Sequence, residues 1–135
     1  MTGKWYGRIL FTVAALWNIF SAGVLATRPD LPLAAVGVNQ PEAQIIARSL
    51  ASSAFTWGIA YALVALGGRR FRILGWLGAL SKALFAAVYI FSLIDGKLSL
   101  LAAYPAIIEL GFAVLFVAYL WQTRKEPALA EKPLI

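Results

Sequence analysis

Two ionisable residues lie inside apolar stretches of the sequence. Lys82 is near the centre of residues 75–89 (GWLGALSKALFAAVY), and Glu109 lies within residues 102–121. A lone charge in the middle of a bilayer costs roughly 2.5–3.5 kcal/mol, so these two side chains should face each other or a wet cavity. A carboxylate and an ammonium can both exchange protons. Lys82 and Glu109 are therefore candidate catalytic residues and the centre of a candidate ligand-binding cluster.

Other polar residues could complete this cluster. Asn18 falls at mid-membrane depth, and Arg48 is a second candidate partner for Glu109. The full set of predicted ligand-binding residues is Asn18, Arg48, Tyr61, Lys82, Tyr89, Tyr104 and Glu109. The alternative is structural: a buried ion pair can fix helix register and rotation without binding anything. For a single tyrosine, packing or placement at the membrane surface is the commoner role.

The composition points to lipid as the surroundings of the chain. Of its 135 residues 61% are hydrophobic and 13% charged, and the mean hydropathy is +0.79. An ordinary soluble domain is about 25% charged. Four apolar segments are long enough to cross a hydrocarbon core about 30 Å thick. We predict an all-α bundle of four transmembrane helices, with a polar, disordered tail at residues 122–135; the spans are residues 9–27, 45–66, 71–94 and 102–121.

The longest predicted connection, residues 28–44, contains three prolines. Proline ends the first helix and delays the second. Within this connection residues 31–38 are moderately apolar, and we predict a short interfacial turn over the mouth of the bundle. Trp17 and Trp57 are too deep for the aromatic belts at the membrane surfaces, so we expect them to pack against the cavity or against lipid.

Several kinds of chemistry are excluded by residue types that the sequence lacks. It contains no cysteine and no histidine, which removes thiol redox chemistry, haem ligation through either residue, and the usual zinc and copper sites. We therefore predict no metal and no cofactor. The net charge of +6 would raise the question of nucleic acid in a soluble protein. Here the basic residues lie at helix ends, so we predict no nucleic-acid partner.

The distribution of basic residues predicts the orientation. The connections after the first and the third span hold one basic residue each, Arg28 and Lys97. The other basic residues outside the membrane lie in the N-terminal flank, the turn after the second span and the tail. Those basic residues are Lys4, Arg8, Arg69, Arg70, Arg72, Arg124, Lys125 and Lys132. Because basic residues stay on the cytoplasmic side, we predict that both termini are cytoplasmic.

Short motifs carry a family resemblance over residues 16–120. They are WN in the first span, proline at its exit, WGIAY before a basic turn, GWLGALSK, and an acid in the last span. The chain resembles small bacterial four-helix integral membrane proteins, similar in size and layout to DoxX-like proteins and mostly without an assigned activity. The residues that match the family pattern are Trp17, Asn18, Gly58, Tyr61, Gly78 and Lys82. Glu109 stands where an aspartate is more usual. The resemblance implies the four-helix fold and a place in a bacterial inner membrane, and it brings no activity with it.

Three functional hypotheses follow from the sequence. The leading one is a non-enzymatic membrane protein that binds a hydrophobic ligand or a larger membrane complex through its internal polar cluster. The second is an isomerase-like enzyme on a lipid-soluble substrate, with Glu109 as acid or base and Lys82 setting its charge state. The third is a small proton-coupled transporter. The lipid bilayer is the one partner that all three require, and the oligomeric state is left open.

Overall fold

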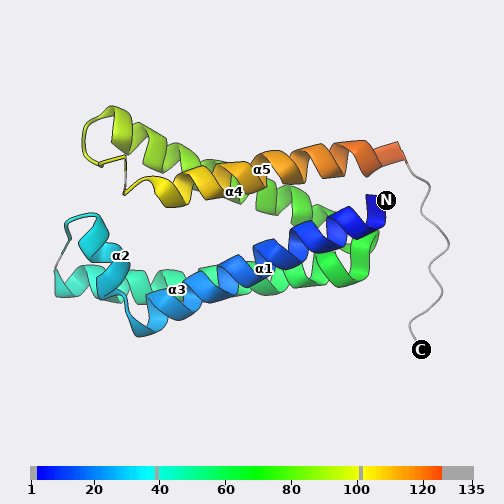
Figure 1. The fold of residues 1–135 in the computed structure, drawn as a ribbon. Coiled ribbons are helices and arrows are strands. Elements are labelled where there is room, and N and C mark those ends of the chain that lie inside the picture. Colours follow the sequence, from blue (N-terminus) through cyan, green and yellow to red (C-terminus); the bar gives the residue numbers. More distant parts are fainter. Residues whose placement is uncertain (1–2, 39, 101, 126–135) are drawn as a thin grey trace.

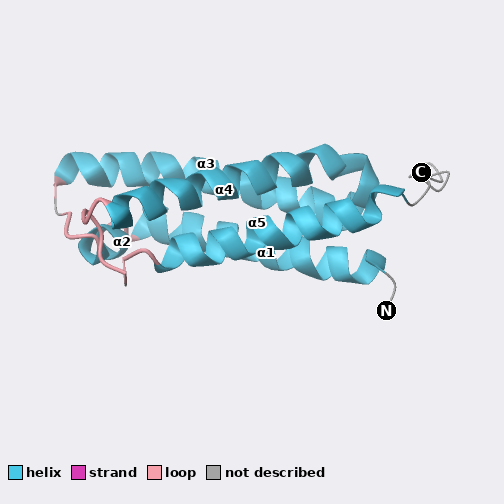
Figure 2. Cartoon of the chain, turned by 90° about the horizontal axis from the view of Figure 1, so that it is seen from above, coloured by secondary structure: helices cyan, strands magenta, loops and turns pink. Residues whose placement is uncertain are grey.

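The protein folds into four long helices and one short helix. In the computed structural model residues 3–38, 40–100 and 102–125 are described. They form α1 (Gly3–Thr27), α2 (Asp30–Ala35), α3 (Pro41–Gly67), α4 (Arg72–Ile94) and α5 (Tyr104–Gln122), with 3₁₀ turns at Gly68–Phe71 and Thr123–Lys125. All helices but α2 are long and apolar enough to cross a membrane (Figures 1 and 2). The prediction of an all-α, four-span bundle is confirmed.

The long helices are arranged as two antiparallel pairs. α1 packs mainly on α3 and α4 mainly on α5, whereas contacts between the pairs are fewer. In Figure 1 the pairs converge at the end where α1 begins and diverge toward the end that carries α2. An aromatic cluster joins them at the converging end: the ring of Phe11 lies 4.4 Å from that of Phe116, which lies 5.2 Å from Tyr61. All three side chains are almost fully buried.

Small residues bring α1 and α3 close together. Ala47, Ala51 and Gly58 are buried on one face of α3. A Cβ atom added at Gly58 would lie 2.7 Å from Ile19 Cγ1 and 3.3 Å from the backbone oxygen of Ala15. Such close approach of backbones is the usual basis of helix association in lipid, where burying apolar surface gains little.

The basic residues gather at one end of the bundle, which we call the basic end. Arg8 at the start of α1, Arg70 in the α3–α4 turn and Arg124 after α5 all belong to it (Figure 1). Arg72 lies there too and donates hydrogen bonds to the backbone oxygens of Leu120 and Thr123. These carbonyls lack helical partners at the end of α5. The shared end fits the predicted orientation; that it faces the cytoplasm stays a prediction.

Helical structure at the C-terminal side continues past the predicted boundary at residue 121. Gln122 belongs to α5, and Thr123–Lys125 forms a 3₁₀ turn in which Thr123 is buried and its hydroxyl donates to the Tyr119 carbonyl, 2.8 Å away. The predicted start of the disordered tail, residue 122, is therefore too early. Its remainder, residues 126–135, lies outside the described residues.

At the opposite end α2 takes the place of the predicted interfacial turn. Proline is tolerated in the first turn of a helix, so Pro32 does not prevent helix formation. Arg28 Nη2 lies 3.0 Å from Asp30 Oδ2, and this hydrogen-bonded pair holds the chain as it turns from α1 into α2. The hydrogen bond from Arg28 lowers the pKa of the Asp30 carboxyl and raises that of the Arg28 guanidinium.

Candidate functional site

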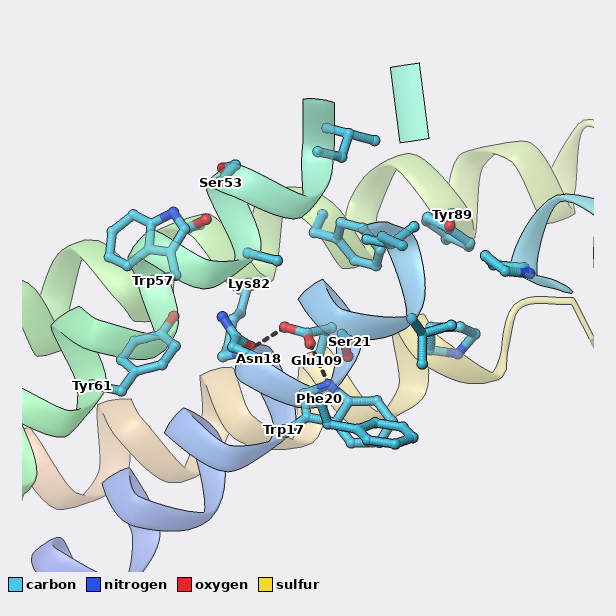
Figure 3. Close-up of a pocket in the computed structure, with 18 of the residues that line it drawn as sticks. Trp17, Asn18, Phe20, Ser21, Ser53, Trp57, Tyr61, Lys82, Tyr89 and Glu109 are labelled. Carbon is cyan, nitrogen blue, oxygen red and sulfur yellow. Dashed lines mark hydrogen bonds and ion pairs between the residues drawn. The ribbon is translucent and has the colours of Figure 1, made fainter. Parts of the chain in front are cut away.

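Four side chains meet in the middle of the bundle and form what we call the polar cluster. Lys82 Nζ lies 2.5 Å from Glu109 Oε2 and donates a longer hydrogen bond, 3.3 Å, to Asn18 Oδ1. Trp17 Nε1 donates to the other carboxylate oxygen, Glu109 Oε1, at 2.9 Å. Figure 3 shows the cluster between α1, α4 and α5. The predicted contact between Lys82 and Glu109 is confirmed, and Asn18, which was predicted to complete the cluster, lies in it.

Lys82 is buried although it carries a charge. Its side chain is 3% exposed, while that of Glu109 is 14% exposed. On α4 the residues one turn before and after it, Gly78 and Ala86, are small and buried, which lets the neighbouring helices approach. The ammonium also lies 5.2 Å from the ring centre of Tyr61 and 5.0 Å from that of Phe112. Aromatic faces attract cations, so the rings add to the stabilisation by Glu109.

A cavity of about 350 Å³ adjoins the polar cluster. Residues of all five helices line it, and the lining extends from the polar cluster (Figure 3) to Pro32 of α2. Apart from Lys82 and Glu109 its lining is uncharged, and most of it is apolar or aromatic: Trp17, Asn18, Phe20, Ser21, Val24, Leu25, Pro32, Leu50, Ser53, Ala54, Trp57, Tyr61, Ser81, Phe85, Tyr89, Tyr104 and Pro105.

Six of the seven predicted ligand-binding residues line this cavity. Asn18, Lys82 and Glu109 form the polar cluster, and the three tyrosines lie around it. Tyr61 is at one side, where its hydroxyl donates to the Gly78 carbonyl at 3.4 Å, and Tyr89 is farther toward the α2 end (Figure 3). Tyr104, at the start of α5, is half exposed.

Arg48 is the exception. It is exposed on α3 and is not among the cavity-lining residues, so it does not pair with Glu109 as the sequence had led us to consider. The reason is helix rotation: Ala47 and Ala51 take the buried face of α3, and Arg48, one residue after Ala47, points about 100° away from that face.

Trp17 and Trp57 were predicted to pack against the cavity or lipid, and both line the cavity. The hydrogen bond from Trp17 to Glu109 was not predicted. A usable signal exists in hindsight: an indole N–H within a bilayer needs an acceptor, and Glu109 is the one carboxylate at that depth. Trp57 stacks on Tyr61 with ring centres 5.7 Å apart. The aromatic contacts of Lys82 were also missed.

The hydrogen-bonding capacity of the polar cluster is only partly used. Both carboxylate oxygens accept one hydrogen bond each, from Trp17 and Lys82, and each can accept another. The amide oxygen of Asn18 accepts from Lys82, which leaves the amide N–H₂ group without a partner among the described residues. Within the same residues no group of three or more potential metal ligands is found. The site can therefore offer hydrogen-bond donors and acceptors at the bottom of an apolar cavity.

Four apolar helices of membrane-spanning length define the chain as a small multi-pass helical membrane protein. Comparison with known proteins goes no further, since no family model, curated protein or solved structure matches the chain. The resemblance to DoxX-like proteins therefore stays a prediction.

Proposed function

We propose that the protein is a non-enzymatic membrane protein that binds a hydrophobic small molecule in the cavity next to the polar cluster. The observation that supports this most is the position of the Lys82–Glu109 pair, which is buried at the inner end of a cavity with mostly apolar walls. Small-molecule sites have this composition, with a few placed polar groups in an apolar pocket of about 300–1,000 Å³. Intramembrane ionisable residues are also most often functional.

Access to the cavity fits a ligand that arrives from the bilayer. The side chains of Phe20, Leu50 and Phe85 line the cavity and are also largely exposed on the outside of the bundle. In a membrane these exposed apolar groups contact lipid tails, so a hydrophobic molecule can pass between them without crossing water.

Binding is favoured over proton-transfer chemistry by the surroundings of Glu109. It is the one carboxylate among the described residues that line the cavity, so no second carboxylate is there to share an isomerase-like proton transfer. Each of its oxygens accepts one hydrogen bond, from Trp17 or from Lys82, and keeps a lone pair that can accept a hydrogen bond from a ligand. We propose, in addition, that the membrane is the bacterial cytoplasmic membrane and that the basic end faces the cytoplasm, as the positive-inside rule indicates.

Mass spectrometry of small molecules retained after gentle detergent extraction from the native membrane tests the proposal. The variant Lys82→Met/Glu109→Leu removes the charged part of the cluster without leaving a lone charge. We expect the wild type to retain a hydrophobic compound beyond the bulk lipids, and the double variant to lose at least about 90% of it, since one tenfold step in affinity corresponds to about 1.4 kcal/mol.

Ser52→Ala is the matched control. Ser52 is exposed on α3 outside the cavity, and its hydroxyl donates only to the Ser49 carbonyl of its own helix. This variant should retain as much of the compound as the wild type. A wild type that carries nothing beyond bulk lipid, or a double variant that carries the compound unchanged, would contradict the proposed function.

A further inference from the structure

We infer that the ligand is an uncharged amphiphile whose hydroxyl head group hydrogen-bonds to Asn18 and Glu109, with its hydrocarbon part in the apolar portion of the cavity. The inference rests on the proposed function and names the class of ligand. It follows from the charge, the unused hydrogen-bonding groups and the size of the site.

The charge of the cavity selects against ions. Lys82 and Glu109 are the charged residues among those that line it, and their charges cancel. An anionic or cationic head group would introduce an uncompensated charge into an apolar, membrane-embedded space, which is costly. A neutral head group avoids this cost.

Asn18 supplies the donor for such a head group. An ammonium has no lone pair, so Lys82 can only donate, and the amide of Asn18 must turn its oxygen toward Lys82 Nζ. Its N–H₂ group then points elsewhere and has no partner among the described residues. Among the described residues, every side-chain nitrogen or oxygen atom that is fully buried has a hydrogen-bond partner. The N–H₂ group is therefore accessible, and Asn18 lines the cavity.

Glu109 supplies the acceptor. Each of its oxygens has room for one hydrogen bond beyond those from Trp17 and Lys82. Asn18 and Glu109 contact the same ammonium, and both line the cavity. A hydroxyl is the one simple neutral group that accepts from an amide and donates to a carboxylate with the same atom. An ether or ketone oxygen could use only the first of these contacts.

The rest of the cavity sets the size and nature of the tail. Its volume of about 350 Å³ is at the lower end of the range for small-molecule sites, which suits a single short chain or a small ring system. The walls beyond the cluster include Trp57, Phe85 and Leu25, which offer apolar and aromatic contacts.

A series of probes with one tail and different head groups tests the inference. The full chain is placed in phosphatidylcholine nanodiscs, and ω-brominated decanol, decyl methyl ether, decanoate, decylammonium and decane are titrated while quenching of tryptophan fluorescence is followed. Trp17 and Trp57 line the cavity, so a bound probe quenches them. A Trp5→Phe/Trp76→Phe/Trp121→Phe background removes the three tryptophans that lie outside it. After correction for partition into lipid, decanol should bind about tenfold more tightly than any other probe, the difference expected when one buried hydrogen bond is lost.

Asn18→Asp changes the predicted preference. It keeps an oxygen for Lys82, replaces the N–H₂ donor by an acceptor and gives the cluster a net negative charge. Decylammonium should then bind at least about tenfold more tightly than to the parent, and decanol about tenfold more weakly. Gln122→Glu is the control for the same amide-to-acid change, because Gln122 is exposed at the end of α5 and outside the cavity. It should leave the decanol preference unchanged.

The two proposals fail in different ways. If all five probes bind with equal affinity, or a charged probe binds best, the head-group inference is wrong while hydrophobic ligand binding stands. If no probe quenches the tryptophans of the folded protein, both are wrong. The wild-type series decides the inference by itself, so a poorly folding Asn18→Asp variant would not rescue it.

Discussion

Replacing Lys82 or Glu109 alone should destabilise the protein strongly, whereas replacing both should be nearly neutral. Lys82→Met leaves the Glu109 carboxylate with Trp17 as its only donor, and Glu109→Leu leaves the Lys82 ammonium without a counter-charge. Breaking a buried ion pair by removing one partner costs about 3–5 kcal/mol, because the other charge stays buried and uncompensated. Replacing the whole pair by apolar residues of similar volume removes two desolvation penalties along with the attraction.

Reversible unfolding in mixed micelles of a mild detergent and sodium dodecyl sulfate, followed by circular dichroism, measures this effect. Each single variant should lose about 3–5 kcal/mol, and Lys82→Met/Glu109→Leu should lie within about 1 kcal/mol of the wild type. The matched control is Lys97→Met, which breaks the exposed pair of Lys97 with Asp95 (3.0 Å) in the α4–α5 turn and should change nothing measurable. Additive costs in the double variant would show that the two charges do not stabilise each other in the folded protein.

The sequence allowed a contact between Lys82 and Glu109 to be predicted, with Arg48 as the alternative partner, because depth and topology place the two residues at the same level of neighbouring helices. Both residues lie near mid-membrane, and a short turn makes their helices antiparallel neighbours, so only a modest side-chain extension is needed. The alternative pairing, Arg48 with Glu109, was wrong for a different reason. Whether a residue on α3 faces the interior depends on rotation about the helix axis, and the small residues Ala47 and Ala51 decided that rotation.

Three further features could not be predicted from the sequence for related reasons. The contact from Trp17 to Glu109 depends on the rotation of α1 and α5 together, which no local pattern determines. α2 has six residues and a proline within it, so its segment resembles a turn more than a helix. The cavity is lined by residues of all five helices, so it depends on how the helices pack and leaves no periodic signal in the sequence.

Gly78→Ala should destabilise the protein by about 1–3 kcal/mol, the usual cost of overpacking a well-packed interior. A Cβ atom at Gly78 would overlap the ring and hydroxyl of Tyr61. Tyr61 cannot move aside freely, because Trp57 stacks on it and Phe116 meets it edge-on at 5.2 Å. The ring is also one wall of the cavity and lies 5.2 Å from the Lys82 ammonium, so its displacement should weaken ligand retention as well.

Gly111→Ala on α5 is the matched control, since apart from its chain neighbours and the backbone of its own helix no atom of the described residues would lie within 4 Å of the added methyl group. Alanine forms helices better than glycine, so this variant should be neutral or more stable by up to about 1 kcal/mol. Adding Tyr61→Leu to Gly78→Ala provides the second test: a smaller side chain relieves the overlap, and the double variant should cost less than the sum of its single changes. If Gly78→Ala unfolds at the same detergent fraction as the wild type, or the two costs add, the close contact between α4 and Tyr61 does not position the wall of the site.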